Sequence, residues 1–598
     1  MLVFQPEAIY CTCIGYLDFH TSANYQIQAP PYEDLKADSA RINQTRYATE
    51  IDLHLDFYPA FKRVNDGHCG VYNYCYDGLV YVTYLPLALV FLTDKNGYQN
   101  VYIAPEAFSI ASAEFKDEIE FWQNALPDHL RGQLNTYCLS GARVYLIDGE
   151  EPALKTGGYQ AFGTRQNAFF ASYQRGANDW SYLMGNFAAM AHPLVDSVEL
   201  TVQRVNYDSN DTFTMPYRSR FGSSSKNFTD LVSYRENNCR VAQNTTNGVD
   251  LYGPDALSQY ETIPNPIAHF QQQPGTNPLD ARKQRVNVIL DAVPLSDIEL
   301  PRELQPSLAP LNKSYGVAHF YMLSGSSTGV LALGSFSAAN FTKFGSCLLD
   351  GLTSLKELGA KNLIVDATNN GGGYICIAHV RTPRLGDYGL DTTLRTGPLA
   401  NLLVEKISQG VDPQKLSLYN PLQWRNAAHV TFPANSEWLN PQNINGQECQ
   451  PFDWQPPNDT LFEPHNVVII SNGRRASSCS LFSFSFALDL GVRTVVVGGK
   501  QDVTQHHCGT VGGQSTDFST IDTEVKTLKL KITPLHHLTC ALGDNCTFTL
   551  LMRLSSSSLT NSVQGITWRL GYGIHRRDQP GEWQDHTADF NFPLTKEM

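Results

Sequence analysis

The sequence predicts an α/β protein, and three stretches of the chain carry that prediction. Residues 467–500 read as strand, sharp turn, helix and strand, because two β-branched runs flank small residues and a nearly continuous apolar segment. Residues 341–365 combine a helix that has one apolar face with a short apolar strand. Residues 97–205 instead alternate short strands with turns. The chain of 598 residues, 42% of them apolar, is long enough to bury more than one core.

The first part of the chain is expected to be helical. From Tyr32 to Val64 apolar residues are spread among charged ones at helical spacing, and the turn signal at residues 65–67 ends the pattern. His68 follows that turn and precedes a β-rich run. A single histidine in such a place is usually structural or solvated, so its position alone does not indicate catalysis.

Residues 206–300 are expected to form long surface loops, because they are rich in Asn, Ser, Gln and Pro and show little periodicity. A second region of α/β character opens at Gly316, where two strand-like runs are joined by SGSSTG, residues 324–329. The G-x-S-x-G pattern at residues 325–329 therefore predicts a hairpin turn, since it lies between two strands rather than between a strand and a helix.

Ser477 is the candidate nucleophile of this sequence. It lies where the strand at residues 467–470 turns into the following helix, so backbone N–H groups and the positive end of a helix dipole are available to a developing oxyanion. Acyl transfer needs such donors, because its transition state carries negative charge on the carbonyl oxygen. The alternative is that Ser477 and Ser478 only cap a buried helix, and the stretch alone favours this alternative because serine is a common N-cap.

Three consecutive glycines, residues 371–373, follow the buried strand that ends at Asp366. Without side chains they allow the backbone to approach a ligand or another chain segment closely. No G-x-G-x-x-G pattern and no Gly-Lys-Ser/Thr ending accompany them, so a nucleotide site is not expected. A backbone donor that faces a carbonyl oxygen is the better use, and the sequence indicates no cofactor.

The charge balance argues against nucleic acid as a partner. Lysine and arginine number 44 against 58 aspartate and glutamate residues, which gives a net charge of −14, and the sequence has no basic run. An uninterrupted apolar stretch long enough to span a bilayer is also missing from the sequence, so no membrane span is expected.

Cysteines and glycosylation sequons favour a secreted, extracellular glycoprotein with disulfide bonds. The chain has 13 cysteines and eight N-x-S/T sequons, at Asn43, Asn210, Asn227, Asn244, Asn312, Asn340, Asn458 and Asn545. The first residues do not resemble a signal peptide, because they lack a basic n-region and an apolar h-region. Spacing does not decide which cysteines pair. The pairs considered are Cys69 with Cys75, Cys540 with Cys546, and Cys479 with Cys508, which would clamp the turn at Ser477.

A metal site is not expected. His506, His507 and Cys508 form one local group, and His536 with His537 forms another. Adjacent histidines on a strand point in different directions, and neither group has a second, spaced pair of ligands.

Three motifs stand in a recognisable order: NDGHC at residues 65–69, NLIVDATNNGGG at 362–373, and VVIISNGRRASSCSLFSF at 467–484 followed by GVRTVVVGG. Together they resemble the C-terminal processing, or tail-specific, serine protease family, and in particular its fungal and chlamydial-protease-like branch. The resemblance implies an N-terminal helical region with the histidine (residues 1–95), a PDZ-like β-rich module with long loops (96–300), and a catalytic core with crotonase-like βαβ units (301–598).

The resemblance also implies roles for single residues. Ser477 takes the place of the nucleophile in the family's Ser-Ala-Ser-Ala-Ser turn, and the backbone N–H groups of Gly372, or a neighbouring glycine, and of Ser478 form the oxyanion hole. Many relatives use the lysine of a Phe-Gly-Lys motif as general base. That motif is missing here, since Lys500 stands in a different context, whereas the Asp-Gly-His motif is present. His68 is therefore the expected base.

The third member of the triad departs from the family pattern. Within GEWQDHTADF, residues 581–590, the position that aligns with the family's acid is His586. Glu582 is the acid assigned to orient His68, and Asp585 and Asp589 are the other acidic candidates.

The expected function is that of a serine endopeptidase, which hydrolyses a peptide or protein substrate through an acyl-enzyme on Ser477. The PDZ-like module would capture a peptide end by adding it as a strand. The alternative from a different class is a catalytically inactive peptide-binding or scaffold protein that keeps the fold.

Overall fold

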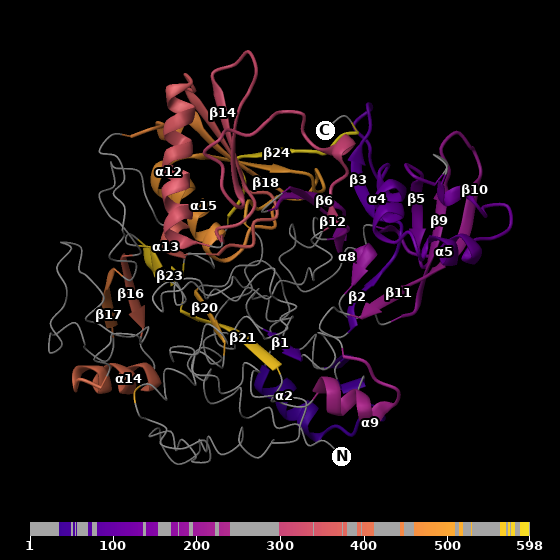
Figure 1. The fold of residues 1–598 in the computed structure, drawn as a ribbon, viewed down its shortest axis with the longest axis horizontal. Coiled ribbons are helices and arrows are strands. Elements are labelled where there is room, and N and C mark those ends of the chain that lie inside the picture. Colours follow the sequence, from indigo (N-terminus) through magenta and orange to yellow (C-terminus); the bar gives the residue numbers. More distant parts are fainter. Residues whose placement is uncertain are drawn as a thin grey trace.

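In the computed structural model of the chain, the described residues form a six-stranded and a five-stranded sheet together with smaller sheets (Figure 1). The structure describes residues 35–49, 52–53, 55–56, 70–73, 80–135, 139–152, 169–176, 179–190, 195–221, 226–239, 298–338, 340–373, 375–378, 391–395, 398–411, 443–447, 460–508, 514–517, 528, 562–569, 572–573, 576–580 and 586–596. Within these ranges, no helix combines the length and the apolar character that crossing a membrane requires.

The six-stranded sheet forms the centre of the C-terminal half, in the order β13-β14-β15-β18-β19-β24. β13 and β14 are antiparallel, and each later neighbouring pair is parallel. The strands comprise Ala318–Met322, Thr328–Leu333, Asn362–Asp366, Val467–Ser471, Arg493–Val497 and Phe590–Phe592. The strands expected at residues 363–365, 467–470 and 494–497 are thereby confirmed, and so is the hairpin turn before β14.

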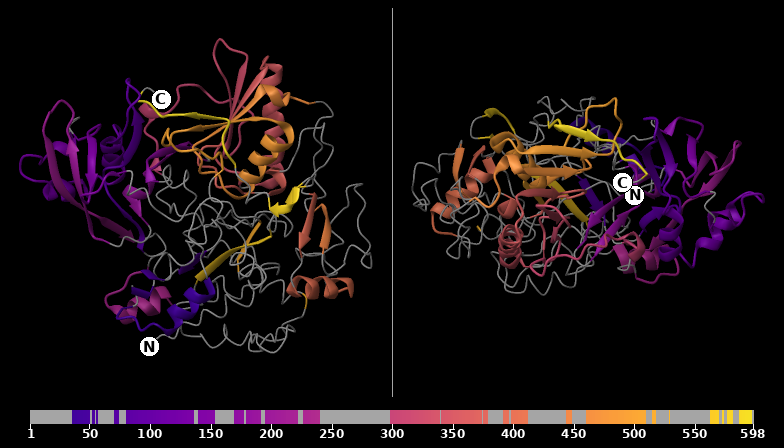
Figure 2. Two further views of the ribbon diagram at one scale, coloured as in Figure 1. Left: turned by 180° about the vertical axis from the view of Figure 1, so that it is seen from behind. Right: turned by 90° about the horizontal axis from the view of Figure 1, so that it is seen from above.

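Two long helices pack against this sheet and connect its parallel strands. α12 (Phe341–Glu357) joins β14 to β15, and α15 (Ser477–Leu490) joins β18 to β19, which makes two βαβ units. Apolar side chains of both helices form one cluster with the strands, in which Phe320 and Ile469 are fully buried. Figure 2 shows both helices beside the sheet when the molecule is seen from behind. Two shorter helices, α13 (Ile375–Ala378) and α14 (Pro398–Ser408), follow β15 along the chain.

A five-stranded antiparallel sheet organises the N-terminal half, in the order β10-β9-β5-β4-β3. Its strands comprise Asn210–Pro216, Ser197–Gln203, Arg143–Ile147, Gln99–Ile103 and Leu89–Thr93. α4 (Ala107–Glu114) and α5 (Ile119–Ala125) lie beside it, and α5 buries Trp122 against the rings of Tyr84 and Phe115.

The expectation of loops from residue 206 onward is wrong for β10 and for β11 (Arg218–Phe221). In β10 alternate side chains, Phe213 and Met215, are buried while their neighbours face outward. The alternation of period two is therefore present, but Asn and Thr on the outer face gave this strand the composition of a loop.

Smaller elements complete the described part. The strands are β1 (Gly70–Asn73), β2 (Val80–Tyr84), β6 (Ser172–Arg175), β7 (Trp180–Leu183), β8 (Ala189–Met190), β12 (Ile298–Glu299), β16 (Asp391–Arg395), β17 (Asn443–Gln447), β20 (Gln514–Asp517), β21 (Ser562–Arg569), β22 (Tyr572–Gly573) and β23 (Arg576–Pro580). The helices are α2 (Leu35–Gln44), α8 (Gly185–Ala188) and α9 (Leu231–Tyr234). Together with β11, these strands form the sheets β11-β2-β8, β12-β7-β6, β1-β21-β20, β16-β17 and β22-β23.

The two halves meet along the C-terminal segment and the turn after β19. The Thr93 N–H of β3 donates to the Leu594 carbonyl at 2.8 Å. The Gln99 side chain of β4 donates to the Gly499 carbonyl at 3.1 Å and accepts from the Gln501 N–H at 2.8 Å. Because one amide uses both its donor and its acceptor, the turn that contains Lys500 is held against the N-terminal sheet.

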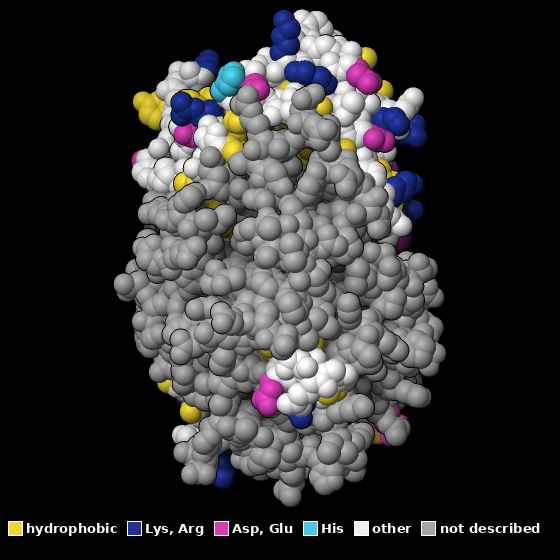
Figure 3. All heavy atoms as spheres, turned by 90° about the vertical axis from the view of Figure 1, so that its left-hand side faces the viewer, with side chains coloured by type: hydrophobic (Ala, Val, Ile, Leu, Met, Phe, Trp, Pro, Cys, Tyr) yellow, Lys and Arg dark blue, Asp and Glu magenta, His cyan; other side chains and the backbone are white. Residues whose placement is uncertain are grey.

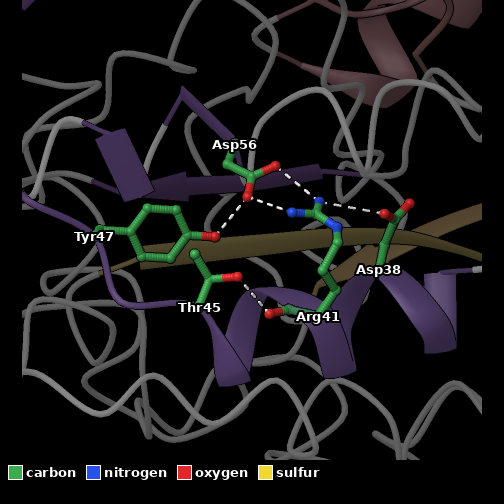
Figure 4. Close-up of polar contacts among 5 residues, drawn as sticks. All are labelled: Asp38, Arg41, Thr45, Tyr47 and Asp56. Carbon is green, nitrogen blue, oxygen red and sulfur yellow. Dashed lines mark hydrogen bonds and ion pairs between the residues drawn. The ribbon is translucent and has the colours of Figure 1, made fainter.

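Asp56 ties α2 to the segment that precedes His68 in the sequence (Figure 4). Its carboxylate accepts two hydrogen bonds from the Arg41 guanidinium, at 2.6 and 2.8 Å, and one from the Tyr47 hydroxyl at 2.5 Å. Burial, followed by the hydrogen bond to Asp56, raises the pKa of Tyr47 to about 12. The helix expected between residues 32 and 64 is present in part as α2.

The described surface carries charged side chains of both signs. On the face shown in Figure 3, lysine and arginine side chains are interspersed with aspartate and glutamate. The sequon asparagines that lie in the described ranges are all exposed, namely Asn43, Asn210, Asn227, Asn312 and Asn340. These positions are therefore sterically open at the surface.

Gly351 allows α12 to pack closely on β13, and an alanine there should destabilise the protein. The added Cβ would lie 2.1 Å from Cε2 of the fully buried Phe320 ring. We expect Gly351→Ala to cost about 1–3 kcal/mol, because overpacking outweighs the gain in helix propensity of about 1 kcal/mol. Denaturant titration measures this, with the exposed Glu357→Ala in the same helix as a control expected within about 0.5 kcal/mol of the wild type. A stabilised Gly351→Ala protein would contradict the packing.

Candidate active site

Ser477 lies at the first position of α15, directly after the turn that leaves β18. Its φ is 52°, in the left-handed region, and its side chain is 2% exposed. Among the described residues, every other non-glycine residue with positive φ is an asparagine or aspartate, for which this conformation is easier. The expected strand, turn and helix are present, and the backbone is strained at the serine itself.

The glycine segment lies against this serine. A Cβ built on Gly372 would be 2.7 Å from the Ser477 Cβ and 3.0 Å from the Ser478 nitrogen, so only glycine permits the approach. The φ of Gly372 is 100°, which also favours glycine. The close approach of backbone that the sequence predicts for these glycines is therefore present, and the segment that it reaches is the turn with Ser477.

Hydrogen bonds hold the Gly372 peptide groups in one orientation. The Gly372 N–H, the predicted oxyanion donor, donates to Oδ1 of Asn370 at 2.9 Å. Its carbonyl accepts from the Phe336 N–H at 2.8 Å and from the Ser335 hydroxyl at 2.9 Å. Within the described part of the chain, no group accepts a hydrogen bond from the Ser478 N–H. The two predicted donors are thus adjacent, but only that of Ser478 is available without a rearrangement.

Two buried asparagines connect the loop after β15 with the loop after β18. The Asn472 side chain donates to Oδ1 of Asn369 at 2.8 Å, and its own Oδ1 accepts from the Asn369 N–H at 3.2 Å. The Asn370 carbonyl accepts from the Ala476 N–H at 3.2 Å. Because the carboxyl ends of adjacent parallel strands meet at one edge of the sheet, these bonds join the glycine segment and the serine turn into one unit.

The β6–β7 hairpin of the N-terminal half packs onto this unit. The Asn369 side chain donates to the Ser172 hydroxyl and to the Tyr173 carbonyl, both at 2.9 Å. The Gln174 side chain donates to the Gly334 carbonyl at 2.7 Å and to the Asn369 carbonyl at 3.2 Å. The position of the glycine segment is therefore coupled to a strand of the other half.

His68 and Glu582, the predicted base and acid, lie outside the described residues, so their roles stay predictions. Lys500 is described: its ammonium lies 2.9 Å from the Asp502 carboxylate, and 38% of its side chain is exposed. A base of the lysine type needs a dry environment that lowers its pKa. Lys500 is partly exposed beside a carboxylate, so its surroundings are not dry.

A buried polar cluster lies beneath the first turns of α15. The Arg475 side chain is fully buried, and its Nε donates to the His507 carbonyl at 2.6 Å while Nη1 donates to the Ser483 hydroxyl. Burial lowers the pKa of His507 well below its ordinary value, and the positive charge of Arg475 adds to this effect. Burial also raises the pKa of Asp366 at the end of β15, although hydrogen bonds from Thr368 and the charge of Arg475 oppose the shift. Because its pKa is lowered in this way, His507 is neutral at neutral pH.

The pairing of Cys479 with Cys508 is not present, because both are buried free thiols, as is Cys347. The Cys508 thiol instead lies 3.3 Å from Nδ1 of His507 and 3.8 Å from the Ser480 carbonyl. The other two pairs that the sequence suggests, Cys69 with Cys75 and Cys540 with Cys546, lie outside the described residues.

Some residues of this region carried no recognisable signal in the sequence. Asn369 and Asn472 are 103 positions apart, and only the parallel pairing of β15 with β18 brings their amides together. Arg475 resembles any basic residue of a surface turn until the fold buries it. His586 was considered only as the counterpart of the triad acid, whereas the structure places it beside His507.

Several solved structures resemble this chain at low sequence identity. It is similar to mature CPAF, with 10% identity and a TM-score of 0.46, over 98% of this chain and 90% of the other. With mature CPAF complexed with lactacystin, the identity is 11% and the TM-score 0.44, over 94% of this chain and 89% of the other. With the photosystem II D1 C-terminal processing protease, the identity is 9% and the TM-score 0.28, over 98% of this chain and 91% of the other.

No family model matches the sequence. No curated protein matches it either. Because the structural likenesses have low identities and TM-scores below one half, they do not by themselves indicate a function.

Replacing Asn472 should destabilise the joined loops. Asn472→Ala removes the acceptor for the Asn369 N–H and the donor to Asn369 Oδ1, and all these groups are buried. We expect a loss of about 1–3 kcal/mol in the free energy of unfolding, since the buried Asn369 N–H is left unpaired, whereas Asn369 Oδ1 still accepts from the Arg474 guanidinium at 3.3 Å. Denaturant titration measures the loss. The control is Asn466→Ala, directly before the same strand and outside these contacts, and equal losses in both variants would contradict the proposed link.

Proposed function

We propose that the chain is a serine peptidase in which Ser477 is the acyl-forming nucleophile. The observation that supports this most is the left-handed backbone of Ser477, with φ 52°, at the start of α15. A serine adopts such a conformation only where the surrounding structure imposes it, and strain of this kind clusters at active sites. The contact with Gly372 adds a second backbone segment beside the carbon that carries the hydroxyl.

In the proposed reaction His68 is the general base. It takes the proton of Ser477 as the hydroxyl oxygen attacks the carbonyl carbon of the scissile peptide, and then gives that proton to the leaving amine. Water hydrolyses the resulting ester and regenerates Ser477. Glu582 orients the imidazole and stabilises its charged form.

The proposed oxyanion hole combines the N–H groups of Ser478 and Gly372. The Ser478 N–H belongs to the first turn of α15, where the helix dipole favours negative charge. The Gly372 N–H donates to Oδ1 of Asn370 at 2.9 Å, so the substrate oxygen has to replace that amide as acceptor. Substrate binding would thus require a local change at Asn370.

We further propose the tail-specific type of peptidase, with the division into residues 1–95, 96–300 and 301–598. The two βαβ units with α12 and α15 support a crotonase-like core. The five-stranded antiparallel sheet with α4 and α5 supports a PDZ-like module that captures a peptide end as an added strand.

A catalytically inactive scaffold is the second candidate, because Ser477 is 2% exposed and the Gly372 N–H has an internal acceptor. A serine-directed fluorophosphonate separates the two candidates. In a peptidase the reagent labels Ser477, and the Ser477→Ala protein stays unlabelled. In a scaffold neither protein is labelled at this position.

Substitutions decide the identity of the base. We expect His68→Ala to abolish turnover of a peptide substrate as completely as Ser477→Ala, whereas Lys500→Ala should be nearly silent because its ammonium is exposed beside Asp502. The acidic limb of the pH profile should follow one group that titrates near about 6.5, the ordinary pKa of histidine. Turnover of the three folded variants is the measurement, and an active His68→Ala enzyme beside an inactive Lys500→Ala would replace histidine with lysine as the base.

We also propose that the protein is secreted and glycosylated, which the exposure of its described sequon asparagines supports. Protein made in a eukaryotic secretory host should then lose the mass of several glycans on endoglycosidase treatment. Asn340→Gln should remove one glycan, whereas Asn96→Gln, an exposed asparagine that lies in no sequon, should remove none. An unchanged mass after treatment would exclude glycosylation.

A further inference from the structure

His507, Cys508 and His586 form a buried group of potential metal ligands outside the proposed catalytic residues. One ligand atom from each lies within 4.8 Å of those of the other two. Their exposed fractions are 3%, 1% and 3%. Buried imidazoles and thiols of this kind, gathered from two distant parts of the chain, are the ligands that soft transition-metal ions prefer.

Backbone pairing fixes the two segments that supply these side chains. The His507 N–H donates to the His586 carbonyl at 2.8 Å, and the Ala588 N–H donates to the Gln505 carbonyl at 2.9 Å. The His586 ring stacks on Phe484 of α15, with centroids 5.0 Å apart and an interplanar angle of 25°. The two segments are therefore held to each other by backbone hydrogen bonds and to α15 by the stacked ring.

The spacing of the group suits a small metal ion. Metal–nitrogen distances of about 2.0 Å and metal–sulfur distances of about 2.3 Å imply that two ligands of one tetrahedral ion lie about 3.5 Å apart. Nδ1 of His507 and Sγ of Cys508 are 3.3 Å apart. Because the ligand atoms lie within 4.8 Å of one another, His586 has to move inward by no more than about 1.5 Å to complete the set.

The summed charge of the three ligands affects which metal ion binds best. A thiolate with two neutral imidazoles carries one negative charge, which a monovalent ion neutralises and a divalent ion exceeds by one. The fully buried guanidinium of Arg475 donates to the His507 carbonyl, so excess positive charge at this place is unfavourable. The charge balance therefore favours Cu⁺ over Zn²⁺, although both ions have a filled d shell, tolerate three protein ligands and accept sulfur and nitrogen.

We propose that His507, Cys508 and His586 form a binding site for a soft d¹⁰ metal ion, Cu⁺ or Zn²⁺. The bound ion joins the segment at residues 505–508 and the segment at 586–588 to each other beneath α15. Binding deprotonates Cys508 and releases that proton to solvent. The site stabilises the helix that carries Ser477, and its occupancy does not depend on peptidase activity.

The test uses the purified full-length protein, reduced and stripped of metal with a chelator. It is dialysed in separate arms against Zn²⁺ and against Cu⁺ kept reduced with ascorbate, and retained metal is measured by mass spectrometry. We expect one ion per chain in at least one arm, and a higher melting temperature of the loaded protein. Cys508→Ala and His586→Ala should each lower the affinity at least about 100-fold, because loss of a mere hydrogen-bond partner of a ligand already lowers it about 10- to 100-fold.

Cys347→Ala is the matched control, since Cys347 is a buried free thiol in α12 and should not affect binding. A spectroscopic measurement on the wild type tests the site without any substitution that could impair folding. Co²⁺ bound by Cys508 should show a thiolate-to-metal charge-transfer band. Retention of no ion in either arm, binding by Cys508→Ala equal to that of the wild type, or Co²⁺ binding without the thiolate band would each overturn the proposal.

Discussion

The reciprocal amide pair of Asn369 and Asn472 is the interaction on which the candidate site depends. It joins the loops that follow two adjacent parallel strands, and both amides are almost completely buried, so each donor and acceptor needs an internal partner. Through it the glycine segment and the serine turn keep one relative position. The close approach of Gly372 to Ser477 is a consequence of that position rather than an independent feature.

Strain and constraint coincide at the same edge of the sheet. Ser477 and Asn369 both have positive φ, at 52° and 55°, and each lies in a segment held by several hydrogen bonds. Such a conformation costs about 1–3 kcal/mol for a non-glycine residue, which the surrounding contacts have to offset. The buried Arg475 side chain contributes to this support from below, because it binds the His507 carbonyl and the Ser483 hydroxyl at once.

The N-terminal half is part of the site rather than a separate attachment. β6 provides acceptors for Asn369 through the Ser172 hydroxyl and the Tyr173 carbonyl, and Gln174 reaches back to the same loop. Gln99 of β4 holds the turn around Lys500 in a similar way. A peptide that displaced the β6–β7 hairpin would therefore alter the glycine segment, which couples the proposed peptide-binding module to the proposed oxyanion hole.

Local patterns in the sequence predict the strands and helices of the C-terminal half. β-branched runs, small residues at the turn and an apolar helix specified β18, Ser477 and α15, because these signals act between near neighbours in the chain. Only the fold reveals which loops meet, that Gly372 approaches Ser477, and that His586 joins His507 and Cys508. These contacts depend on the order and register of parallel strands, and residues far apart in the chain carry no periodic pattern that reveals them.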